Sequence, residues 1–190
     1  MKNFLLPCWF ILVALLGLSC EVSRPPGETT PHITPSSLPT KVPAQGEVTV
    51  KVQPETSVLK VGDTVTVQIL VENVLALSGA DVELQFDPAV LQAQDADPER
   101  EGLQVQPGDF PPPDFQAANT VDNKAGLAHY AVVLLPPNEP VSGSGVIKSI
   151  TFEAMAEGVS PLTLARTDLV SGEAQLIEVT PVPGQVTVGE

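Results

Sequence analysis

Residues 64–73 read Thr-Val-Thr-Val-Gln-Ile-Leu-Val-Glu-Asn, and this stretch decides the fold class. Every second position holds a β-branched apolar residue: Val65, Val67, Ile69 and Val71. An apolar period of two is typical of a β-strand with one face buried and the other face in water. Branched side chains also fit a pleated, half-buried surface well. The stretch therefore predicts an amphipathic strand.

Similar apolar runs occur on both sides of this stretch, separated by clusters of Gly, Pro, Asn and Asp. Eight or nine short strands with turn signals between them predict an all-β sandwich or barrel. The only plausible helix is a single turn over residues 88–92, which Asp87 could cap and in which Pro88 would take the first helical position. The expected strands are residues 47–53, 64–73, 80–86, 127–135, 145–156, 160–166, 174–180 and 185–188.

Length and charge limit what this sandwich can do. The chain has 190 residues, enough for one ordinary domain with appendages, and we find no internal repeat. It has 9 Lys and Arg against 23 Asp and Glu, so its net charge is −14. Binding to DNA or RNA requires cationic side chains that neutralise phosphates. The sequence therefore predicts no nucleic-acid partner.

Residues that carry catalysis or bind metals are few. Cys8 and Cys20 are the only cysteines, and His32 and His129 are far apart, so no Cys or His cluster for zinc or copper is expected. An acidic run does not have EF-hand spacing and predicts a solvated loop. Nucleophile and zinc-protease motifs are absent from the sequence. We therefore expect no enzyme, no bound metal and no cofactor. The acidic run is Asp95, Asp97, Glu99 and Glu101.

The N-terminus has the features of a targeting segment. Lys2 precedes 15 uncharged residues, 4–18, which would span about 22 Å as a helix, less than the roughly 30 Å of a bilayer core. This predicts a signal peptide over residues 1–19. The ending Leu-Gly-Leu-Ser-Cys resembles a bacterial lipobox, which implies that Cys20 is lipidated and anchors the chain at the extracellular or periplasmic face of a membrane. The alternative is an ordinary secretory peptide that is cut nearby.

Residues 20–46 are expected to form a linker between this anchor and the domain. Residues 21–46 include 6 Pro and 7 Ser or Thr, with few aliphatic side chains. Such a segment buries too little apolar surface to offset its ordering entropy. Its proline content favours extended segments of about 3 Å per residue, so it could hold a domain several tens of Å from the membrane.

Six short segments in the rest of the chain carry a family resemblance. In order they are residues 61–65 (VGDTV), 72–74 (ENV), 79–91 (GADVELQFDPAVL), 107–110 (PGDF), 145–152 (GVIKSITF) and 184–188 (GQVTV). The ordered set resembles the cohesin domain family, with Phe86 where the family usually has Tyr. The resemblance covers residues 47–190 and implies a nine-stranded jelly-roll β-sandwich.

The resemblance also implies a function. Cohesins are non-catalytic and bind dockerins, small calcium-binding helical modules carried by enzymes of polysaccharide breakdown. A cohesin-like receptor for a dockerin-bearing partner at the cell surface is therefore expected. The calcium would belong to the partner's fold.

Two of the expected strands carry candidate contact residues. In residues 80–86, Asp81, Glu83 and Gln85 share the face opposite the apolar residues. In residues 127–135 both alternating sets are mostly apolar, so this strand is either buried on both sides or exposes apolar surface to a partner. Two packed sheets without covering helices leave their outer faces wet, which favours exposure.

Both strands match strands of the binding face of cohesins, and Asp81 matches a frequent contact Asp or Asn of the family. The predicted partner-binding residues are Asp81, Glu83, Gln85, His129, Ala131 and Val133.

A carbohydrate-binding or structural surface module of the same fold is the alternative. Flat sugar-binding modules hold polysaccharide on a strip of exposed Trp or Tyr rings. Here the single Trp, Trp9, lies in the signal peptide, and the single Tyr is Tyr130. Binding to polysaccharide is therefore possible but disfavoured.

Overall fold

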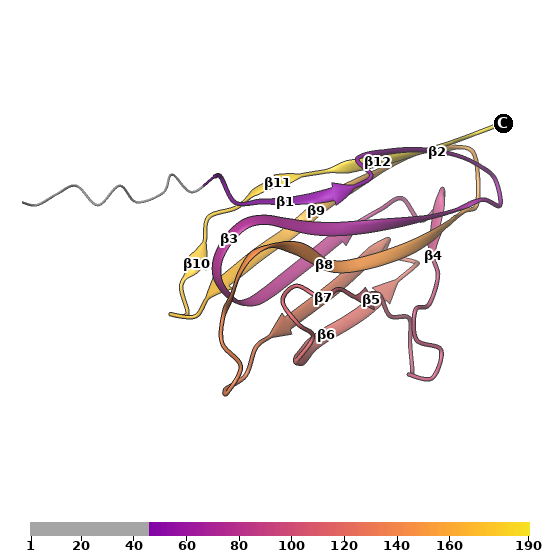
Figure 1. Ribbon diagram of the computed structural model, residues 1–190. Helices are drawn as coiled ribbons and strands as arrows, with labels where there is room; N and C mark the ends of the chain where they lie inside the picture. The colour runs from indigo at the N-terminus through magenta and orange to yellow at the C-terminus, as the bar shows by residue number, and fades with distance from the viewer. Residues whose placement is uncertain (1–45) are drawn as a thin grey trace, which may run out of the picture. The chain divides into compact units, whose positions relative to one another are not determined.

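A computed structural model describes residues 46–190, so the predicted signal peptide, Cys20 and nearly all of the linker lie outside the described residues. The described part consists of strands and turns and has no helix (Figure 1). No helix in residues 46–190 is therefore long and apolar enough to cross a membrane. The strands are β1 (Thr49–Gln53), β2 (Thr56–Lys60), β3 (Thr64–Gln85), β4 (Leu91–Ala93), β5 (Gln106–Pro107), β6 (Phe115–Asp122), β7 (Leu127–Val133), β8 (Val141–Ala154), β9 (Gly158–Ser171), β10 (Leu176–Ile177), β11 (Thr180–Val182) and β12 (Gly184–Gly189).

The long strand β3 joins two predicted strands, residues 64–73 and 80–86, which the sequence analysis separated. Between them the backbone bends, with Asn73 at φ 60° and Ala76 at φ 50° and with shifts of register against β8. Such bulges kink a strand and increase its twist without ending it. Residues 64–72 of β3 pair with β1 and β8, whereas residues 79–85 pair with β7 and β9.

The bend places the two parts of β3 in opposite layers of a sandwich. One layer contains β11, β1, the first part of β3 and β8, with β4 and β5 on the far edge of β8. The other contains β2, β12, β9, the second part of β3, β7 and β6. The prediction of an all-β sandwich is confirmed, with twelve strands instead of nine because several short pairings form separate strands.

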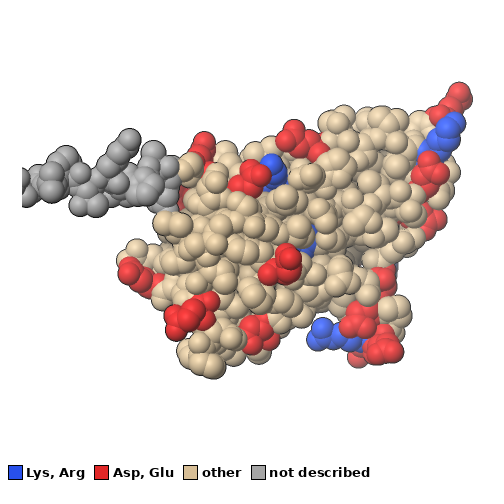
Figure 2. All heavy atoms as spheres, in the orientation of Figure 1, with Lys and Arg blue, Asp and Glu red and all other residues tan. Residues whose placement is uncertain are grey.

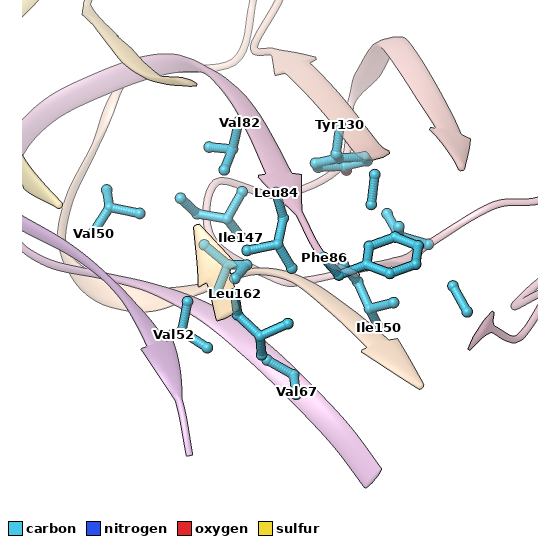
Figure 3. Packing of buried hydrophobic residues seen from close by; sticks show 14 of the residues in the cluster. Val50, Val52, Val67, Val82, Leu84, Phe86, Tyr130, Ile147, Ile150 and Leu162 are labelled. Atoms are coloured by element: carbon cyan, nitrogen blue, oxygen red, sulfur yellow. The ribbon is translucent and has the colours of Figure 1, made fainter. Parts of the chain in front are cut away.

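The two layers meet in a continuous apolar core (Figure 3). The alternating residues of the quoted stretch, Val67, Ile69 and Val71, are buried in it. Phe86 and Phe152 pack with their ring centroids 4.9 Å apart. The predicted helical turn over residues 88–92 is wrong, because β4 begins at Leu91. Asp87 still caps the turn before it, since its Oδ1 accepts a hydrogen bond from the Ala89 N–H at 2.8 Å.

Candidate functional site

The six predicted partner-binding residues lie side by side on one outer surface. The second part of β3 and β7 are antiparallel neighbours, with Asp81 opposite Ala131 and Glu83 opposite His129. Along both strands the residues between them are buried in the core. Strand β7 therefore exposes one of its two apolar sets, and the alternative of burial on both sides is wrong.

The outer surface of β9, β3, β7 and β6 is called the front face below. Cross-strand pairing adds residues of β6 and β9 that the sequence analysis did not include. The front face is formed by Phe115, Ala118 and Thr120 of β6, Leu127, His129, Ala131 and Val133 of β7, Asp81, Glu83 and Gln85 of β3, and Arg166 and Asp168 of β9.

Four charged or titratable side chains form a cluster on the front face. Asp81 Oδ1 lies 2.7 Å from His129 Nε2, and Asp81 Oδ2 accepts a hydrogen bond from Arg166 Nη1 at 3.2 Å. The same Arg166 nitrogen lies 3.3 Å from Glu83 Oε1. Asp81, Glu83, His129 and Arg166 are the charged cluster. Since carboxylates accept several hydrogen bonds each, Asp81 and Glu83 can also accept bonds from a docked molecule.

An apolar strip lies beside the charged cluster. Phe115 of β6 pairs with Val133 of β7, and these side chains are 51% and 38% exposed. Leu135, two residues beyond Val133, is 45% exposed. Its N–H donates to Asp114 Oδ2 at 2.7 Å, and this bond is the main reason why the pKa of Asp114 lies below its usual value. Phe115, Val133 and Leu135 are the apolar strip.

A buried lysine lies beneath the charged cluster. Lys148 of β8 is fully buried, and its Nζ donates to the carbonyl oxygens of Val82 and Ala128, at 2.9 Å each. Burial lowers the pKa of Lys148 to about 7, while Asp81 and Glu83 act in the opposite direction. Lys148 is not among the predicted site residues, although it alternates in phase with the core residues Ile150 and Phe152.

The acidic loop around Asp95 is held by internal hydrogen bonds, and Tyr130 is buried. The carboxylate of Asp95 accepts hydrogen bonds from the N–H groups of Asp97 and Gln104, which orders the acidic loop. Within residues 46–190 no three His, Cys, Asp or Glu side chains are grouped so that they could hold a metal ion. Tyr130 is 1% exposed, and burial raises its pKa to about 12. In this part of the chain Phe115 is the one large aromatic ring that is exposed.

Figure 2 shows that acidic side chains are spread over the face in view and that basic side chains are few there. The fold and this surface define the class: an all-β sandwich module with an outer sheet face that combines charged and apolar residues. The chain belongs to the cohesin domain family, whose model matches residues 48–188. The resemblance seen in the sequence is thereby confirmed.

Solved cohesin structures share this fold. A type II cohesin domain from the cellulosome of Acetivibrio cellulolyticus is 18% identical, with a TM-score of 0.64 over 74% of this chain and 95% of that chain. A non-cellulosomal cohesin from the archaeon Archaeoglobus fulgidus is 14% identical, with a TM-score of 0.59 over 76% and 93%.

A third structure, a type I cohesin–dockerin complex from Clostridium thermocellum, is 16% identical, with a TM-score of 0.61 over 76% of this chain and 100% of that chain. No curated protein sequence is significantly similar to the chain.

Proposed function

We propose that this protein is a non-catalytic receptor that binds a dockerin module through the front face. The observation that carries the proposal is the charged cluster beside the apolar strip on one exposed sheet of a cohesin domain. Several cohesins of this fold have been solved as complexes with dockerins. Polysaccharide breakdown is the corresponding proposed setting.

The two parts of the front face suit different contacts. Asp81 and Glu83 would accept hydrogen bonds from Lys, Arg or hydroxyl groups on the helices of the partner. Ala131 and the apolar strip would form a dry centre, where charged residues are usually depleted. The small side chain of Ala131 allows a helix to approach the sheet closely. Gln85 and His129 would contribute polar contacts at the margin.

Binding to a panel of dockerins, measured by calorimetry with and without calcium, tests this proposal. At least one dockerin should bind the full chain when calcium is present, and chelation should abolish binding because the dockerin needs calcium to fold. Binding that survives unfolding of the dockerin would contradict the proposal, and so would failure of all dockerins with verified folds.

Replacing Asp81 by alanine should weaken dockerin binding by about 1 to 3 kcal/mol, because a donor on the partner would remain unpaired in the interface. Calorimetry on the variant and the wild type measures this difference. Asp109→Ala, which removes an exposed carboxylate outside the front face, is the matched control and should bind like the wild type. Equal losses in both variants would indicate a general charge effect instead of a contact.

We also propose that the protein is a lipoprotein, anchored by Cys20 at the extracellular or periplasmic face of a bacterial membrane and held away from it by the linker. The support is the sequence of the first 46 residues. Cys20→Ala should move the protein from the membrane fraction to the soluble fraction in its native host. Cys8→Ala, within the signal peptide, is the control and should stay with the membrane. Equal recovery of both variants without detergent would contradict lipidation.

Polysaccharide binding is the weaker candidate, because Tyr130 is buried and Phe115 is the one exposed aromatic ring in residues 46–190. The full chain should not be retained on cellulose, chitin or xylan beyond a non-binding control protein. A dissociation constant in the micromolar range or tighter for any of them would make sugar binding the leading function.

A further inference from the structure

Lys148 connects the core of the sandwich to the front face. Its ammonium group donates to the carbonyl of Val82, which lies between Asp81 and Glu83, and to the carbonyl of Ala128, which precedes His129. None of the salt bridges in residues 46–190 involves Lys148. Its charge is thus buried under the charged cluster without a direct carboxylate partner, an arrangement that is costly unless nearby charges compensate.

The charged and titratable groups around the two carbonyls that Lys148 contacts lie on three strands. Asp81 and Glu83 of β3 are the negative charges that support its protonated form. His129 and the buried Tyr130 lie on β7, and Arg166 lies on β9. Asp81 and Glu83 carry two negative charges, and Arg166 and a protonated Lys148 carry two positive charges, so these four groups balance. When Lys148 is neutral, the same cluster has one uncompensated negative charge.

We propose that Lys148 is a specificity-determining residue of the front face, which gives up its proton when a cationic side chain of a partner docks on Asp81 and Glu83. The inference rests on the proposed function. The ammonium loses one proton to the solvent and becomes an amine, and the cation of the partner replaces it as the counter-charge of the two carboxylates. No covalent bond between protein and partner is formed or broken.

Electrostatics gives the direction of this coupling. A cation of the partner that docks at Asp81 and Glu83 repels the positive charge of Lys148 across a medium of low dielectric constant. Since proton and partner compete, each weakens the binding of the other by the same factor. Cationic partners should therefore bind more tightly as the pH rises. Because burial already lowers the pKa of Lys148 to about 7, the exchange falls near neutral pH. The net charge of −14 also favours cationic partners.

The first experiment needs no partner. In the full chain with ¹³C-labelled lysine, NMR should show one lysine that titrates near neutral pH, and this signal should be missing from Lys148→Met. Asp81→Asn combined with Glu83→Gln should move its titration to lower pH, because both supporting charges are gone. This double variant keeps the test valid if Lys148→Met does not fold. A titration of Lys148 above pH 9.5 would overturn the inference.

The second experiment uses a dockerin that binds the wild type and has Lys or Arg at its contact surface. Calorimetry at pH 7 in buffers of different ionisation heat should show release of up to about half a proton per complex, because a lysine with a pKa of about 7 is half protonated at this pH. Affinity should rise by up to about tenfold per pH unit below the titration of Lys148. In Lys148→Met both effects should disappear. Lys51→Met is the matched control, since Lys51 pairs with Glu72 in the other layer, and it should retain both effects.

Proton uptake, or equal release in wild type and Lys148→Met, would overturn the inference. Failure of every dockerin to bind would overturn the proposed function, and with it the claim that partner binding displaces the proton of Lys148. An ordinary titration of Lys148 in the free protein would overturn the inference alone.

Discussion

Ala131→Arg should abolish measurable dockerin binding while the domain stays folded. Ala131 lies on β7 between Ala118 of β6 and Asp81 of β3, in the middle of the front face. A long arginine side chain there would fill the space that a partner helix needs. Its guanidinium would also pair with the Asp81 carboxylate, which would then be less available to the partner. Hot spots of binding, where a single change costs about 2 kcal/mol or more, cluster near the centre of interfaces, and charged residues are depleted there.

Calorimetry with a dockerin that binds the wild type checks this result, and thermal unfolding checks the fold. Because Ala131 lies on an outer surface, the melting temperature should fall by no more than a few degrees, as for most surface substitutions. Thr64→Arg, on the exposed surface of the other layer, should bind like the wild type. If Ala131→Arg folds and still binds normally, the partner docks elsewhere. If it unfolds, β7 is core on this side.

The alternating pattern predicted which side chains of β3 and β7 face outward, because a strand turns successive side chains to opposite faces. It could not predict the charged cluster. Asp81 and His129 are 48 residues apart in the sequence, so their contact depends on how β3 and β7 pair, and that register is set by packing of the whole sandwich. Arg166 lies where β9 shifts register against β3, so its place also depends on the partner strand.

Two other residues escaped the sequence analysis for different reasons. Phe115 follows a proline-rich and acidic segment that predicts a loop, yet strand β6 begins there because β7 offers it an edge to pair with. Lys148 lies within a predicted strand, residues 145–156, at a position in phase with its buried residues. A lysine at a position where alternation expects a core residue is a signal for a buried charge, because such residues are almost never fully buried without compensating contacts.

The stability of the protein should rise with pH between 7 and 9.5 because of Lys148. Burial lowers the pKa of this lysine from 10.5 to about 7 in the folded state, so the unfolded chain binds more protons in this interval. Stability rises with pH wherever the unfolded state binds more protons. The contribution of Lys148 to the unfolding free energy is fully present above its pKa in the unfolded chain, 10.5. It is lost as the pH falls to its pKa in the folded state, about 7. From pH 7 to 9.5 the gain should be about 3 kcal/mol.

Tyr130 limits the interval in which this effect can be measured. Burial raises its pKa from 10.0 to about 12, so its contribution is present below pH 10 and is lost as the pH rises towards 12. Denaturant unfolding should therefore be measured from pH 6 to 9.5. Growing repulsion in a chain with a net charge of −14 also opposes stability at high pH, so the wild type alone does not isolate Lys148.

The informative quantity is the difference in unfolding free energy between the wild type and Lys148→Met at each pH. Methionine fills a similar volume without charge, so at pH 6 the variant should be as stable as the wild type or more stable, as for other buried charges replaced by apolar residues. As the pH rises, the wild type should gain on the variant by about 3 kcal/mol. Lys51→Met loses a half-exposed lysine and should stay parallel to the wild type. A difference that is independent of pH would show that Lys148 keeps an ordinary pKa, and that the charged cluster above it compensates its burial completely.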